Sequence, residues 1–180
     1  MSEPDDLISC DVPDVLPVLP LRSTVLFPSR VVSVQISQEQ NLKLLDGHPK
    51  GDDIIAVGAL IDPEGRYTRK NLAPVAVAAR VLSRIKMGSG LSQVIFQGLR
   101  RVRLRKIGAV RPYFQARVEL VEDSGPDSPV TRGLISQVVK LLESLVEIDE
   151  RFPEELVKVV QLNRENGCRC ADLLSDMLPF

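Results

Sequence analysis

The hydrophobic pattern of the chain changes its period once, near residue 123, and this change limits the possible folds more than any other feature. Before it, apolar residues recur at every second position in several stretches, most regularly in 100–110 and 113–122. Alternation of this kind is typical of strands with one buried face. After it, apolar residues recur every three or four positions, which is the stripe of amphipathic helices. The sequence therefore predicts an α+β chain, with a β-rich part over 15–122 and a helical part over 123–180.

Turn and capping signals subdivide both parts. The glycines of GSG at 88–90 separate two long apolar stretches and predict a hairpin. The alternation slips near Lys106, which indicates a β-bulge. In the second part, Ser128 followed by Pro129 predicts the start of a long helix. The helices expected there are 129–148, 152–163 and 168–178.

The stretch LPVLPLRSTVLFPSR, residues 16–30, reads as a strand although it contains Pro17, Pro20 and Pro28. A proline lacks the backbone N–H of the sheet ladder, which confines it to edges, strand starts or bulges. The residues alone leave these three positions open for the prolines of the first strand. Residues 1–14 are acidic and carry no lysine or arginine, so they are expected to form a flexible acidic tail.

Composition narrows the classes of function. The net charge is −1, and the chain has five Phe, two Tyr and no Trp. Both features argue against a nucleic-acid-binding domain, which usually carries a basic excess or stacking aromatic residues. Three cysteines without a disulfide spacing indicate a reducing compartment. Since no signal peptide and no apolar run of roughly 18 residues is found, we expect a cytoplasmic protein without a membrane segment.

No arrangement of residues predicts catalysis or metal binding. His48, the only histidine, lies in a polar turn with no nucleophile in a recognisable frame around it. Neither common glycine-rich phosphate-binding pattern occurs in a suitable place. Cys168 and Cys170 are two residues apart on an expected helix, so their thiols diverge by about 200° and do not share one ion. We predict no catalytic, cofactor-binding or metal-binding residue in this chain.

Four apolar residues are candidates for an exposed contact surface. Phe27, Ile85, Met87 and Leu91 are expected at strand ends. Met and aliphatic side chains at a loop rim suit contacts with varied apolar partners. The alternative, that these side chains fold back onto the core, accounts for the pattern equally well.

Three arginines are the other surface candidate. Arg101, Arg103 and Arg105 alternate along one expected strand and would line one of its faces. There they could meet phosphate groups or the carboxylates of a partner subunit. The alternative is a solvated strand face, in which the arginine stems cover apolar surface, and the neutral net charge favours it.

Several motifs resemble, in order, the N-terminal domain of the Lon family of ATP-dependent proteases. The opening LPxLPLR, with a valine and an FP pair after it, falls within 16–28. The stretch 76–104, including Gly98 and Arg101, is similar to the family's VARI-like strand and the strand that follows. The closing CRCADLLSDMLP of 168–179 resembles the family's LADLIAxxLP helix. The resemblance covers nearly the whole chain after the acidic tail.

The resemblance implies a PUA-like β pseudobarrel followed by a C-terminal helical bundle. It also implies that the first strand, with its prolines, lies along the edge of the barrel. It further implies assembly with the other subunits of a Lon hexamer and recognition of unfolded, damaged or degron-bearing protein substrates. With that function, Phe27, Ile85, Met87 and Leu91 become the candidate polypeptide-binding residues. ATP and Mg are implied only for the full-length enzyme, a Ser-Lys endopeptidase whose ATPase and protease modules are absent here, so no catalytic residue is carried over. The alternatives are a stand-alone PUA-like domain that binds RNA through its alternating arginines, and a scaffold that acts by oligomerising.

Overall fold

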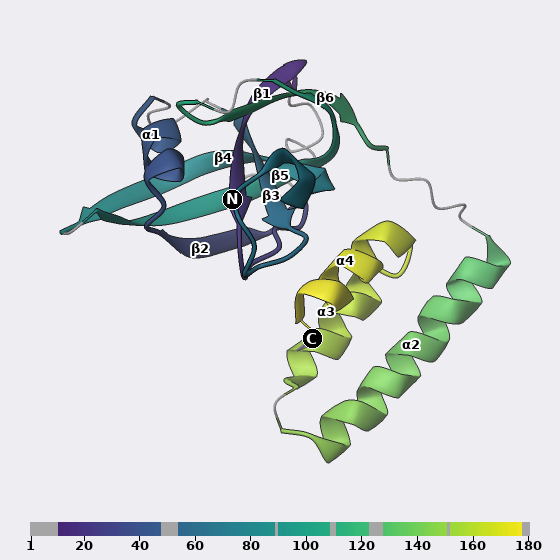
Figure 1. Cartoon of the computed structure of the whole chain (residues 1–180). Helices are drawn as coiled ribbons and strands as arrows, with labels where there is room; N and C mark the ends of the chain where they lie inside the picture. Colours follow the sequence, from purple (N-terminus) through teal and green to yellow (C-terminus); the bar gives the residue numbers. More distant parts are fainter. Residues whose placement is uncertain are drawn as a thin grey trace. The chain divides into compact units, whose positions relative to one another are not determined.

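The structure is a computed structural model that describes residues 11–47, 54–88, 90–108, 111–122, 128–150 and 152–177. The chain divides into two compact units, Met1–Glu122 and Asp123–Phe180 (Figure 1). The first unit holds a mixed sheet and the second holds helices, so the predicted α+β class is confirmed. Among the described residues, no helix is long and apolar enough to cross a membrane.

A six-stranded sheet forms the first unit. The strands have the order β2-β5-β4-β3-β1-β6, and β5 also pairs with β6. This extra pairing closes all the strands except β2 into a ring and leaves β2 at the outer edge. The elements are β1 (Val15–Leu21), β2 (Val31–Ile36), α1 (Glu39–Gly47), β3 (Ile54–Leu60), the 3-10 turn η2 (Arg69–Asn71), β4 (Leu72–Met87), β5 (Leu91–Ile107) and β6 (Phe114–Leu120).

β1 contains two prolines and yet has neighbours on both sides, which corrects the expectation of an edge strand. Its first half, from Val15 to Val18, pairs with β6, and its second half, from Val18 to Leu21, pairs with β3. Pro17 and Pro20 therefore each lie where β1 is paired on one side only. A proline is tolerated at such a position because one side of the strand needs no ladder bond.

Bulges bend the two longest strands. β4 and β5 have 16 and 17 residues, and their pairing shifts register between Val81 and Ser83 and again at Leu99. A further shift between Leu104 and Lys106 leaves Arg105 as the extra residue, which confirms the bulge predicted near Lys106. Since bulges increase strand bending and twist, β5 can leave β2, follow β4 and close the ring against β6.

Two hydrophobic cores lie on opposite faces of the central strands. In β1, Leu16 and Val18 belong to the core inside the ring, whereas Leu19 and Leu21 belong to the second core. Successive strand residues point to opposite faces, so β1 is buried on both sides. The second core is covered by α1, which contributes Leu44 and Leu45, and by residues of β2.

Three helices form the second unit, in which α2 (Pro129–Ile148) runs alongside α3 (Glu154–Leu162) and α4 (Gly167–Met177) (Figure 1). The predicted cap of α2 is present, because the hydroxyl of Ser128 accepts a hydrogen bond from the backbone N–H of Thr131 at 3.1 Å. The core of the unit consists of Leu142, Phe152, Leu156, Val160 and Cys170.

Candidate functional site

The long hairpin of β4 and β5 brings three of the four predicted apolar residues together. Met87 is directly opposite Leu91, and Ile85 is opposite Gln93, at the end of the hairpin near its turn. Ile85 is 61% exposed and Met87 46% exposed, while Leu91 is half-buried. Because residues two apart in a strand share a face, these three side chains lie on one solvent-facing surface.

Ile95 extends this surface and was missed in the sequence. It follows Leu91 at an even spacing along β5, pairs with Ser83 of β4 and Ser33 of β2, and is half-buried. Strict alternation along 91–97 would have identified it. We refer to Ile85, Met87, Leu91 and Ile95 as the outer hairpin face.

One polar side chain on the same surface is paired within the protein. The side-chain amide of Gln93 donates to the hydroxyl of Ser33 on β2, at 2.6 Å between Nε2 and Oγ. An apolar ligand that covered this amide would leave one of its two N–H groups hydrogen-bonded, so part of the usual cost of burying a polar group would be avoided.

Phe27 lies in a different place from the other three predicted residues. It is half-buried, and its turn is joined to Gly98 of β5, whose N–H donates to the carbonyl of Arg30 and whose carbonyl accepts from the N–H of Ser29. Gly98 is seven residues from Leu91 along the same strand, roughly 23 Å at the usual rise per residue. The four predicted residues therefore do not form one rim.

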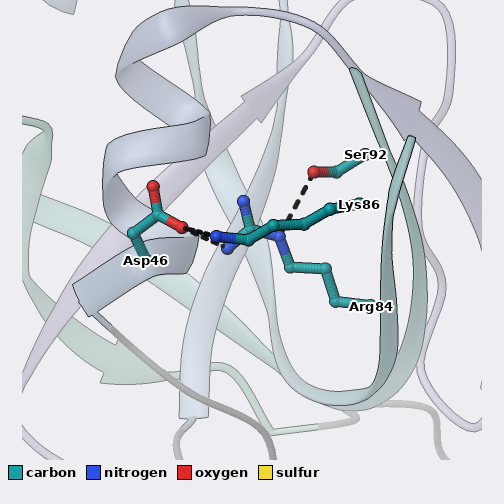
Figure 2. A network of polar contacts seen from close by, with 4 residues as sticks. All are labelled: Asp46, Arg84, Lys86 and Ser92. Atoms are coloured by element: carbon teal, nitrogen blue, oxygen red, sulfur yellow. Dashed lines mark hydrogen bonds and ion pairs between the residues drawn. The ribbon is translucent and has the colours of Figure 1, made fainter. Parts of the chain in front are cut away.

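The inner side of the hairpin is held to α1 by a network of ion pairs. Asp46, in the last turn of α1, contacts Arg84 and Lys86 of β4, each at 2.9 Å (Figure 2). Arg84 also donates from Nε to the hydroxyl of Ser92 on β5, at 3.3 Å. Because Arg84 contacts both Asp46 and Ser92, the network joins both strands of the hairpin to the helix. The Arg84 side chain is only 11% exposed.

The cations around Asp46 alter its titration. Hydrogen bonds from Lys86 and then from Arg84 hold the pKa of the Asp46 carboxyl below its ordinary value. A carboxylate in the last turn of a helix opposes the helix dipole, and the two cations offset this. The strands that form the outer hairpin face are therefore joined to α1 on their opposite side by ion pairs.

The alternating arginines do not form a uniform basic face. Arg103 and Arg105 are exposed, whereas Arg101 is half-buried. Arg105 is paired with Glu119 of β6, with 2.7 Å between Nε and Oε2. A nucleic acid at this surface would have to compete with that carboxylate, which agrees with the expectation of an ordinary solvated strand face.

The structure describes two of the three cysteines, Cys168 and Cys170, and both are free thiols. Cys170 is buried, its thiol donates to the carbonyl of Asn163 at 3.1 Å, and burial raises its pKa.

In the described part of the chain, no group of three or more His, Cys, Asp or Glu is placed to hold a metal ion. His48 and Cys10 lie outside the described residues.

Comparisons with known proteins all point to one family. The family model of the ATP-dependent protease La (LON) substrate-binding domain matches residues 15–180. The Lon protease of Dictyoglomus thermophilum is 25% identical over 92% of this chain, and Lon protease 2 of Herpetosiphon aurantiacus is 29% identical over 97%. The match covers 21% and 22% of these relatives, so the chain spans about one fifth of their length.

Solved structures share the fold. The crystal structure of a Lon N-terminal domain protein from Xanthomonas campestris superimposes with a TM-score of 0.61 at 18% identity, over 92% of this chain and 83% of that one. The N-terminal domain of a Mycobacterium avium complex Lon protease gives a TM-score of 0.63 at 17% identity, over 89% and 81%. Since the family model matches every residue from 15 to 180, the chain belongs to the family of LON substrate-binding domains.

Proposed function

We propose that this chain recognises unfolded, damaged or degron-bearing polypeptides for a Lon-type ATP-dependent protease, with the outer hairpin face as the contact surface. Family membership supports the substrate class. The observation that carries the site is the gathering of Ile85, Met87, Leu91 and Ile95 on one solvent-facing surface of a hairpin. Exposed apolar side chains grouped in this way are typical of protein-interaction sites.

The chemistry of the outer hairpin face fits a partner without one fixed sequence. Its side chains are aliphatic or thioether, and methionine adapts its shape to different partners. The Asp46 network keeps the supporting strands in place from the other side, so little ordering is needed on binding. A surface of this kind favours many weakly bound segments over one tightly bound ligand.

The closed sheet supports a more specific description of the fold. A ring of β5, β4, β3, β1 and β6 with β2 outside it is the arrangement expected of a PUA-like pseudobarrel, and the three helices after it correspond to the C-terminal bundle. Phe27 belongs to the turn that Ser29 and Arg30 join to Gly98, and its backbone carbonyl lies against that glycine.

Binding of reduced, carboxymethylated casein tests the proposed site. Ile85→Glu with Met87→Glu should weaken binding at least fivefold, because each change places a charge on an apolar contact. Ile61→Glu is the matched control, since Ile61 is 64% exposed, close to the 61% of Ile85, and lies after β3. Equal loss in both proteins, or no loss in either, would remove the site assignment.

The role of the whole protein is a separate part of the proposal. We assign ATP hydrolysis, its Mg and peptide-bond cleavage to other modules, and assembly with other Lon subunits to this domain. The mass of the polypeptide that an antibody to this domain detects in native extract tests this. A mass several times 19.9 kDa supports a domain within a full protease, whereas a mass near that value indicates a stand-alone relative.

A further inference from the structure

β2 is the one strand of the described sheet that has a neighbour on one side only. It pairs with β5 in an unbroken antiparallel register, from Val31 opposite Gln97 to Ile36 opposite Ser92, and lies at the margin of the sheet (Figure 1). The other five strands each have two neighbours. A strand at such an edge presents a row of N–H and C=O groups without ladder partners, and the proposed function makes no use of this row.

The register shows which backbone groups of β2 point away from the sheet. Just before β2, the N–H of Gly98 donates to the carbonyl of Arg30 at 2.8 Å. Bonded and non-bonded pairs alternate along an antiparallel ladder, so the even-numbered residues of β2 bond to β5 and the odd-numbered ones direct their N–H and C=O groups outward. These residues, which we call the β2 edge, are Val31, Ser33 and Gln35.

β2 lacks the features that usually keep an edge strand from pairing with another chain. Natural edges often carry charged side chains, prolines or β-bulges. The sequence of β2, VVSVQI, contains no charged residue and no proline, and its pairing with β5 has no register shift. By contrast, register shifts interrupt the pairings of β3 with β4, of β4 with β5 and of β5 with β6. The β2 edge is therefore a regular, uncharged template for another strand.

Apolar side chains adjoin the β2 edge on both faces of the strand. Ser33 is directly opposite Ile95 of the outer hairpin face, and Val31, on the same face as Ser33, is 56% exposed. On the opposite face, Val32 and Val34 are half-buried against the second core. A strand added to the β2 edge therefore covers apolar surface on both faces and extends the outer hairpin face.

From these features we infer that β2 is an acceptor strand, to which an extended segment of a substrate polypeptide adds through its backbone. The inference rests on the proposed function, because it specifies how the substrates of that function are held. Donors and acceptors that repeat about every 7 Å match another extended backbone, whatever its side chains. The β2 edge supplies affinity common to all unfolded segments, and the outer hairpin face selects the apolar ones.

N-methylated peptides test whether the backbone carries the contact. The probe is a fluorescently labelled, acetylated and amidated peptide, Lys-Val-Thr-Val-Thr-Val-Lys, added to the full chain. Methylation of every second backbone nitrogen leaves one free edge and should retain the affinity, whereas methylation of every nitrogen should weaken it about tenfold or more, because several hydrogen bonds are lost. Fluorescence anisotropy measures both. Equal affinity of the fully methylated peptide, or no binding of the unmethylated one, would overturn the inference.

Amide hydrogen exchange followed by NMR locates the added strand. At saturation the unmethylated peptide should slow exchange about tenfold or more at Ser33 and Gln35, whose N–H groups point outward. Val32 and Val34 should change little, since their N–H groups already bond to β5. Binding without protection of Ser33 would overturn the inference and leave the peptide elsewhere on the chain. Protection of Ser33 in the free chain that disappears on dilution would assign the edge to a second copy, which also overturns it.

A proline in the β2 edge removes its central donor. Ser33→Pro should weaken peptide affinity about fivefold or more, and its ladder with β5 should persist because proline is tolerated where the N–H faces away from the neighbouring strand. Ser33→Ala is the matched control, since it also loses the hydroxyl that accepts from Gln93 but keeps the N–H, and it should bind like the wild type. Equal affinities would contradict the acceptor strand. If circular dichroism shows Ser33→Pro unfolded, the methylated peptides and the exchange at Ser33 decide.

Casein binding separates this inference from the proposed function. If Ser33→Pro binds casein as the wild type does, while Ile85→Glu with Met87→Glu does not, the acceptor strand is wrong and the proposed function stands. If casein does not bind the wild-type chain at all, the proposed function fails, and the substrate role of the β2 edge fails with it even where the peptide protects Ser33.

Discussion

The backbone carbonyl of Phe27 lies where a side chain on Gly98 would begin. A Cβ added at Gly98 would be less than 3.0 Å from that oxygen, a separation that real Cβ atoms essentially never show. The hydrogen bonds of Gly98 with Ser29 and Arg30, at 3.0 and 2.8 Å, hold the two segments at this distance. Only glycine allows the turn to pack so closely on β5.

Gly98→Ala should therefore destabilise the first unit by about 1–3 kcal/mol, the usual range for overpacking against a rigid neighbour. Urea denaturation followed by circular dichroism measures the change. Gly88→Ala is the control, since a Cβ there meets no atom within 4 Å, and it should be neutral or slightly stabilising. Similar losses in both proteins would show that Gly98 is not a point of close contact.

Only those parts of the candidate site that depend on local sequence patterns were predictable from the sequence. The face shared by Ile85, Met87 and Leu91 follows from alternation and a two-sided hairpin, both of which are local properties. The position of Phe27 depends instead on pairing with Gly98, about seventy residues away in the chain, and no local pattern encodes that register. The bulge at Arg105 was predictable because a slip in alternation is itself local.

The link between α1 and the hairpin could not have been predicted either. Asp46 is separated from Arg84 by 38 residues, and charged residues on exposed surfaces have many possible partners. The expectation that the first strand lies at an edge was wrong for a related reason. β1 exchanges one neighbour for another at Val18, and that arrangement arises only when the sheet closes.

Asp46→Asn should loosen the hairpin from α1. The lowered pKa of Asp46 means that its carboxylate is favoured in the folded protein, so its contribution is present above the ordinary value of 3.8 and is lost as the pH falls through the folded pKa. Thermal melting should show the variant less stable at neutral pH, and the difference should shrink in acid below that value.

Glu39→Gln is the control for that prediction. The pKa of Glu39 is also lowered, by Lys43, but this ion pair of 2.6 Å lies within α1. Amide hydrogen exchange should show weaker protection in the hairpin for Asp46→Asn and unchanged protection there for Glu39→Gln. Identical exchange in both variants would contradict a role of Asp46 in fixing the hairpin.

Leu156→Ala should strongly destabilise the helical unit. Leu156 is 0% exposed and belongs to its hydrophobic core, and truncating such a leucine typically costs about 2–5 kcal/mol. Leu162→Ala in the same helix is the control, because Leu162 is 84% exposed and surface changes usually stay within about 0.5 kcal/mol. Loss of helical circular dichroism in urea measures both, and equal midpoints would contradict the packing of α3.

Two cationic residues are directly opposite each other where β5 pairs with β6, and reversing the charge of one of them should stabilise the sheet. Lys106 is directly opposite Arg117, both exposed, whereas the neighbouring Arg105 is paired with Glu119. Like charges directly opposite destabilise a sheet, and opposite charges contribute about 0.2–1 kcal/mol. Arg117→Glu should therefore raise the urea midpoint and Arg105→Glu should lower it, although both change the net charge equally. The two shifts should converge at high salt because exposed charges are screened. If both variants shifted in the same direction, net charge rather than this strand register would govern the closure between β5 and β6.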